Sequence, residues 1–120
     1  MPTRRIHLKF DEYLWAHGII PDLKGSNTVH DRMDRGLVKY GSNHRYVDFY
    51  HSEEGIRNWL RGKAHLFYQK TLTKYLRIAL GHICLDDMAS RHPEYNEEQL
   101  IKSAYRSFIQ KGYHRKFFKY

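Results

Sequence analysis

The sequence predicts an all-α fold, a single compact bundle of about five helices with a long central helix and a basic carboxyl-terminal tail. Apolar residues recur every three or four positions in successive segments, which is the spacing of one helix face. Residues typical of helix starts precede these segments, and glycine or proline follows them. A chain of 120 residues has the usual size of one domain. Its ten tyrosines, six phenylalanines and two tryptophans supply large apolar surfaces to one core.

The first two helices are predicted over residues 10–20 and 29–40. Asp11 is expected in the first turn of the first helix, where the helix dipole favours an acid, and Gly18 is expected to end it. The polar stretch 21–27 between the two segments predicts a loop.

The middle of the chain carries further boundary signals. Thr28 is the predicted cap of the second helix and Gly41 its end. Weak alternation at 46–50 predicts a short extended piece. Ser52, followed by two glutamates, predicts the start of a third helix, which Gly62 breaks or bends.

The central helix is predicted over residues 64–90, where one apolar side persists for several turns. Pro93 ends it. Asn96 and Gln99 then form a capping-box pair at the start of the last helix, which continues to Gly112.

The single cysteine excludes an internal disulfide and any cysteine-rich zinc motif. Cys84 is predicted to be a buried thiol in a helix, as in a protein of a reducing compartment. No stretch approaches the roughly 20 apolar residues that span a bilayer, and the first residues lack the apolar run of a secretory signal. The sequence therefore predicts a cytoplasmic protein without a membrane segment.

Positive charge is concentrated at the carboxyl end of a chain whose net charge is +8. Residues 101–120 hold six basic side chains and no acid: Lys102, Arg106, Lys111, Arg115, Lys116 and Lys119. Aromatic side chains between them, Tyr105, Tyr113, Phe117, Phe118 and Tyr120, are potential stacking surfaces for bases. This pattern suits a polyanion, with nucleic acid first, and predicts salt-dependent binding with weak sequence preference. One alternative is a solvated helix face followed by a frayed tail. Another, for Phe117 and Phe118, is a tail that packs onto the core.

Nine histidines point to metal chemistry, since histidine is the commonest metal ligand. Two of them lie in predicted helices and have an aspartate four residues later, on the same helix face: His30 with Asp34, and His82 with Asp86. These four side chains are the predicted ligands of zinc, manganese or iron, which accept mixed nitrogen and oxygen ligands. The alternative is that each pair forms only a local hydrogen bond.

The segment between the two pairs supplies the predicted catalytic residues. His44 and His51 are expected as secondary ligands or proton carriers. Arg45 is expected to hold an anionic group in bidentate fashion.

The dipeptide His30-Asp31, with His7 before it and Asp86 after it, resembles the motif of HD-type metal phosphohydrolases. The resemblance implies an all-α domain that binds a divalent metal through these four residues, and a metal-activated water that attacks a phosphoester.

Residues 29–86 also resemble small prokaryotic and phage proteins of unassigned function, which share a VHxxLD…HR…H pattern. This chain has Met33 at the leucine position of that pattern. The likeness implies no activity, but it favours the two His–Asp pairs as ligands over the HD-type set of His7, His30, Asp31 and Asp86.

Three functions follow from these patterns. The first is a helical metal-binding domain with metal-dependent phosphoester hydrolase activity. The second is a small basic nucleic-acid-binding protein that acts through its carboxyl-terminal helix and tail. The third is a non-enzymatic interaction module, including a homo-oligomer, since aromatic and arginine side chains are enriched at interface hot spots.

Overall fold

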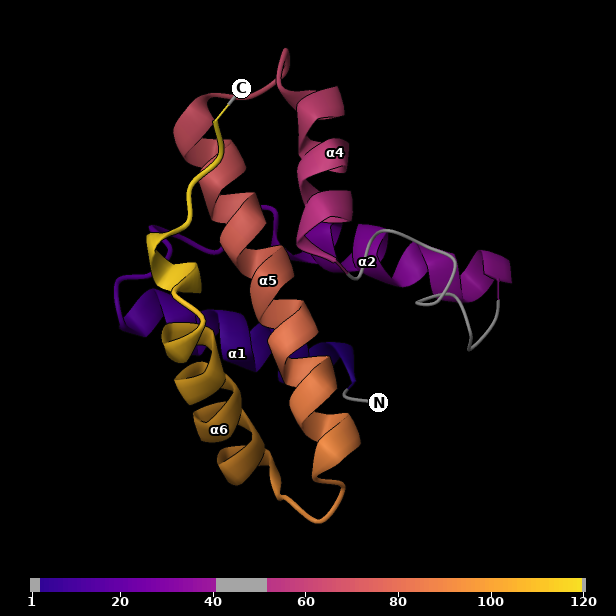
Figure 1. The fold of residues 1–120 in the computed structure, drawn as a ribbon, viewed down its shortest axis with the longest axis vertical. Helices are drawn as coiled ribbons and strands as arrows, with labels where there is room; N and C mark the ends of the chain where they lie inside the picture. Colours follow the sequence, from indigo (N-terminus) through magenta and orange to yellow (C-terminus); the bar gives the residue numbers. More distant parts are fainter. Residues whose placement is uncertain (1–2, 41–51, 120) are drawn as a thin grey trace.

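One long helix, α5 (Gln69–Arg91), runs through the middle of the molecule and packs against all the other α-helices that the structure describes (Figure 1). The computed structural model describes residues 3–40 and 52–119, with residues 35–40 described as backbone alone. Around α5 lie α1 (Arg4–Ala16), α2 (Ser26–Tyr40), α4 (Glu53–Lys63), α6 (Glu97–Gln110) and the short 3-10 helix η3 (Tyr113–Arg115). The described part of the chain contains no strand, and the predicted all-α bundle with a long central helix is confirmed.

Helix α5 is central because apolar side chains cover more than one of its sides. Its buried apolar residues are Leu72, Leu76, Ile78, Ala79, Leu80, Cys84 and Leu85. The predicted start at residue 64 is wrong, since Leu66 and Tyr68 are exposed in the connection from α4 and the helix begins at Gln69. In the described residues, no helix is long and apolar enough to cross a membrane.

Helix α1 begins six residues before its predicted start, at Arg4 instead of residue 10. Thr3 caps it, and its hydroxyl oxygen accepts a hydrogen bond from the backbone N–H of Ile6. The helix ends at Ala16, four residues before the predicted end, and Gly18 follows with a positive φ of 74°. The earlier start puts His7 on a helix.

Helix α2 begins at Ser26, so Thr28 lies inside the helix and the prediction that it is the cap is wrong. Gly25 precedes the helix with a φ of 85°, which turns the chain into it. Gly41 and the extended piece predicted at 46–50 lie outside the described residues.

The predicted caps of α4 and α6 are confirmed. The hydroxyl of Ser52 accepts a hydrogen bond from Gly55 N at 3.0 Å. Asn96 and Gln99 form a full capping box, with side-chain to backbone distances of 2.8 and 2.9 Å. The central helix α5, which lies between α4 and α6 in the sequence, ends at Arg91, two residues before Pro93.

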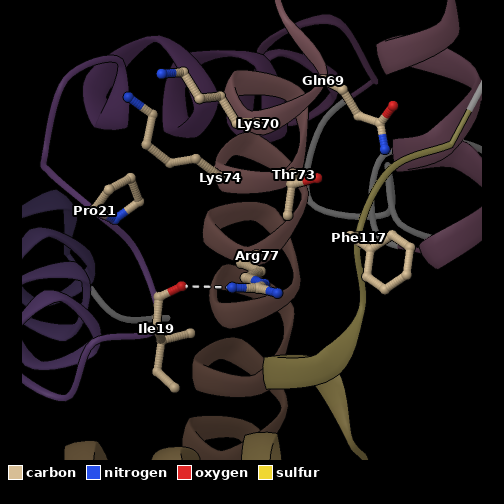
Figure 2. Close-up of a pocket in the computed structure, with 8 residues that line it drawn as sticks. All are labelled: Ile19, Pro21, Gln69, Lys70, Thr73, Lys74, Arg77 and Phe117. Carbon is tan, nitrogen blue, oxygen red and sulfur yellow. Dashed lines mark hydrogen bonds between the residues drawn. The ribbon is translucent and has the colours of Figure 1, made fainter.

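The tail after η3 packs along α5 as far as residue 119. Phe118 is fully buried, and its backbone N–H donates to the hydroxyl of Thr73 at 3.0 Å. Arg77 of α5 donates from Nε to the carbonyl oxygen of Lys116 at 2.9 Å. A terminal nitrogen of the same guanidinium donates to the carbonyl oxygen of Ile19, also at 2.9 Å (Figure 2). The alternative of a tail that packs onto the core is therefore confirmed for Phe118, whereas Phe117 is 46% exposed.

Cys84 is a buried thiol in α5, as predicted, and burial raises its pKa to about 11. Because the thiolate is the reactive form, we expect the native protein to react very slowly with a disulfide reagent at pH 8. In denaturant the thiol returns to an ordinary pKa and should react within minutes. Comparable reaction rates with and without denaturant, measured by absorbance, would contradict the buried environment.

Candidate metal centre

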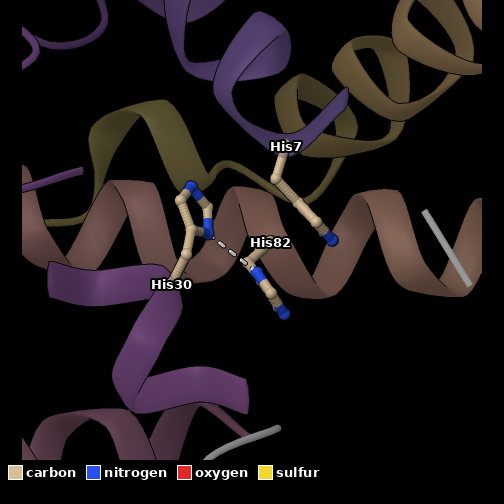
Figure 3. Close-up of side chains that lie close together, drawn as sticks. All are labelled: His7, His30 and His82. Atoms are coloured by element: carbon tan, nitrogen blue, oxygen red, sulfur yellow. Dashed lines mark hydrogen bonds between the residues drawn. The ribbon is translucent and has the colours of Figure 1, made fainter. Parts of the chain in front are cut away.

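Three histidines from three helices meet in the interior: His7 of α1, His30 of α2 and His82 of α5 (Figure 3). Their exposed fractions are 3%, 0% and 1%. The rings of His7 and His82 stack with centroids 3.9 Å apart and planes 9° from parallel. Imidazoles are seldom gathered in an interior without partners, because a buried polar group that lacks hydrogen bonds is costly.

Gly81 allows α1 to approach α5 this closely. A Cβ atom at this position would lie 3.0 Å from a ring carbon of Phe10 and 3.3 Å from a methyl carbon of Leu14, both on α1. The missing side chain thus leaves room for Phe10 and Leu14 to pack closely on α5, beside the point where His7 stacks on His82.

His30 is held at both ring nitrogens. Its Nε2 lies 2.6 Å from Oδ2 of Asp11, and its Nδ1 lies 2.9 Å from Nδ1 of His82. Burial raises the pKa of the fully buried Asp11 carboxyl, and the hydrogen bond to His30 opposes this effect.

His82 faces carboxylates with its other nitrogen. Its Nε2 lies 3.2 Å from Oδ2 of Asp86 and 3.5 Å from Oδ1 of Asp34. His7 lies on the other oxygen of Asp86, with Nε2 3.1 Å from Oδ1. Burial lowers the pKa of His82 to about 4, so its ring is neutral at pH 7, as a metal ligand must be.

The row Asp11–His30–His82–Asp86 contains three polar contacts, and each contact between such groups needs one hydrogen or one cation between them. Two neutral imidazoles supply only two hydrogens. When both Nε2 atoms carry their hydrogen toward the carboxylates, two Nδ1 lone pairs face each other at 2.9 Å. The row is completed either by a third proton, held for example on Asp11, or by a cation between the two Nδ1 atoms.

The distances suit a transition metal. Ligand nitrogens with bonds of 2.0–2.1 Å lie about 2.9 Å apart at a right angle and about 3.3 Å apart in a tetrahedral site. The Nδ1 atoms of His30 and His82 are already 2.9 Å apart. One potential ligand atom from each of the three histidines lies within 4.8 Å of the other two, so the group could hold one ion. Imidazole ligands with carboxylates beside them fit zinc, iron or manganese rather than calcium.

Asp34 forms the outer edge of the cluster. Its side chain is 35% exposed, and its Oδ2 lies 3.2 Å from the guanidinium of Arg4. The same guanidinium lies 2.8 Å from Asp31, whose side chain is 64% exposed. Among the described residues, the Asp34 side of the cluster leads to solvent.

The structure brings the four predicted ligands together. Asp34 and Asp86 both contact His82, and His82 contacts His30. His44, Arg45 and His51 lie outside the described residues, and their catalytic roles stay predictions. The HD-type ligand set is not brought together as a whole, because Asp31 forms an ion pair with Arg4 at the surface, away from the buried histidines.

Asp11 is the residue that sequence reasoning placed wrongly, as a first-turn acid instead of the buried partner of His30. The signal was available, because His7 and Asp11 show the same four-residue spacing as the two predicted pairs. The structure also exchanges partners between helices, so that His7 contacts Asp86 and His30 contacts Asp11. Spacing along one helix cannot show such an exchange.

The predicted nucleic-acid residues have varied surroundings. Lys102 pairs with Glu98 at 2.9 Å, and Lys116 lies 3.4 Å from Glu53. Lys111 and Lys119 lie over aromatic rings. Arg106 and Arg115 are exposed. Nucleic-acid binding through these six side chains stays a prediction.

Comparison with known proteins gives this chain no relative. A scan against protein-family models found no match, and searches of curated proteins and of solved structures found none either. Both family resemblances therefore stay predictions, and the functional argument depends on the geometry of the cluster.

Proposed function

We propose that this chain is a helical metal-binding domain that holds one divalent transition metal ion at His7, His30 and His82 and uses it to hydrolyse phosphoesters. One observation carries the proposal. The Nδ1 atoms of His30 and His82 lie 2.9 Å apart in the interior, while the Nε2 atom of each ring faces a carboxylate. That is the orientation of metal-binding histidines, which direct one nitrogen to the ion and the other to a supporting acceptor.

The carboxylates have distinct roles in this proposal. Asp11 accepts the Nε2 hydrogen of His30 and fixes the tautomer that leaves Nδ1 for the ion. Asp86 supports His7 and His82 with its two oxygens. Asp34, at the half-exposed edge, is the carboxylate in place to contact both the cluster and solvent.

A divalent ion at this position would lower the pKa of a water molecule beside it and so supply the nucleophile for hydrolysis. Asp34 Oδ1 faces the cluster and would accept the proton of that water. Arg4 pairs with both Asp31 and Asp34 and offsets one of their two negative charges, which reduces the repulsion between this edge and an anionic phosphoester.

The hydrolase proposal predicts that Asp34→Asn lowers the rate of bis(p-nitrophenyl) phosphate cleavage by about 100-fold or more, the usual contribution of a general base. The measurement is nitrophenolate release by the manganese- or zinc-loaded protein, with the metal content determined in parallel. Asp87→Asn is the matched control, because Asp87 lies on α5 and pairs only with Arg91 among the described residues. A metal-loaded protein that cleaves no faster than the metal salt alone would refute the hydrolase activity and leave the metal site standing.

A further inference from the structure

A second site lies away from the histidine cluster, in a groove between the α1–α2 connection, the first half of α5 and the carboxyl-terminal tail (Figure 2). Its volume is about 390 Å³. Basic side chains of α5 and one aromatic ring of the tail dominate its lining, which consists of Ile19, Pro21, Gln69, Lys70, Thr73, Lys74, Arg77 and Phe117.

Arg77 is a partly buried cation without a carboxylate partner in the described structure. Its guanidinium donates to the backbone carbonyls of Ile19 and Lys116, which carry no net charge. Burial lowers its pKa, and no acidic group compensates. Partial burial of a charge is costly unless a counter-charge is near, so the groove favours an anion beside Arg77.

The two lysines differ in their pairing. Lys74 is 94% buried at its side chain (6% exposed), and its Nζ lies 2.7 Å from Asp22, so this pair is internally neutral. Lys70 is exposed and makes no ion pair with any described residue. Lys70 and Arg77 therefore leave two uncompensated positive charges in the groove, which matches the charge of one phosphate monoester.

Phe117 supplies a flat surface on the opposite side. Its ring is 46% exposed, although the next residue, Phe118, is fully buried. Figure 2 shows Phe117 on one side of the groove, the two lysines extending toward the other side, and Arg77 between them. Exposed aromatic rings beside basic side chains are the usual means of holding a base and its phosphate.

We propose that this groove binds a nucleotide unit, with its phosphate at Arg77 and Lys70 and its base stacked on Phe117. The ligand is either a free mononucleotide or one unit of a single strand, which share this chemistry. The proposal does not depend on the metal centre, and its test is made with EDTA present.

The experiment is a titration of the ¹⁵N-labelled full chain with AMP, with inorganic phosphate and with a four-residue oligo-dA, followed by amide and arginine Nε shifts. We expect AMP to shift Lys70 and Arg77, and to bind at least about 5-fold more tightly than phosphate because of stacking. Lys70→Glu should weaken AMP binding about 10-fold or more, and Phe117→Ala about 5-fold or more. Arg91→Glu makes the same change of charge at the exposed far end of α5, about 20 Å along the helix from Arg77, and should stay within about 2-fold of the wild type.

The source of the ligand follows from the two nucleotide probes. Tighter binding of the oligonucleotide identifies a strand, and equal or tighter binding of AMP identifies a free nucleotide; both support the site. The proposal is overturned if no probe shifts the groove residues, if phosphate binds as tightly as AMP, or if Arg91→Glu weakens binding as much as Lys70→Glu.

Discussion

His82→Ala is expected to reduce the metal content of the purified protein from about one ion per chain to about a tenth or less, since it removes one of the three ligands and the ring on which His7 stacks. His82 is the residue at the centre of the cluster, stacked on His7 and 2.9 Å from His30. Elemental analysis after dialysis against a mild chelator measures the loss. Added zinc should raise the melting temperature of the wild-type protein by roughly 10 °C at about 100 times its Kd, and should leave the variant unchanged.

Two further variants separate ligand loss from misfolding. His65→Ala removes an exposed histidine of the α4–α5 connection and should keep the full metal content. Asp11→Asn keeps the shape of the buried partner of His30 and should weaken metal binding about 10- to 100-fold, because only the supporting charge is lost. A wild-type protein that stays folded and metal-free in the presence of zinc would refute the metal site. The histidines would then be structural residues whose contacts are completed by a proton instead of a metal ion.

Phe118→Ala is expected to lower the free energy of unfolding by about 3 kcal/mol, the usual cost of removing a fully buried phenylalanine. The side chain is 0% exposed and anchors the tail against α5, where its backbone also bonds to Thr73. Urea denaturation followed by tryptophan fluorescence measures the loss, which corresponds to a fall of roughly 10 °C in melting temperature for a domain of this size.

Phe117→Ala is the matched control, one residue away and 46% exposed. It should change stability by about 0.5 kcal/mol or less, as is usual at the surface. Equal losses for the two variants would mean that the tail is not anchored through Phe118.

The sequence predicted the helices where local signals decide the boundary. The capping box at Asn96 and Gln99 and the serine cap at Ser52 involve contacts of only three residues, and both form as expected. The start of α1 was missed because Thr3 precedes a basic segment with little apolar periodicity, and its helix is stabilised by packing on α5 instead. Tertiary contacts often decide such boundaries, and they cannot be derived from a local pattern.

The candidate site also has one part that the local sequence pattern predicts and another part that depends on tertiary packing. His30 and His82 were identified because each has an aspartate on its own helix face. His82 does contact Asp86 of its own helix, but the partners of His30 come from other helices, at separations of 19 residues for Asp11 and 52 residues for His82. Which ring nitrogen faces which carboxylate depends on the crossing of α1, α2 and α5, and periodicity along one helix does not contain that information.

One position of α5 that shapes the proposed metal site carries no ligand atom: Gly81, directly before His82. Gly81 lets α1 lie against α5, and a methyl group there would already press on Phe10 at 3.0 Å. Alanine would raise the intrinsic helix propensity at this position, so glycine here lowers the stability of α5 as a helix but allows α1 to pack closely against it. A designer who replaces helical glycines to stabilise this protein would thus raise the helix propensity of α5 and, with the same substitution, press α1 and its His7 away from His82.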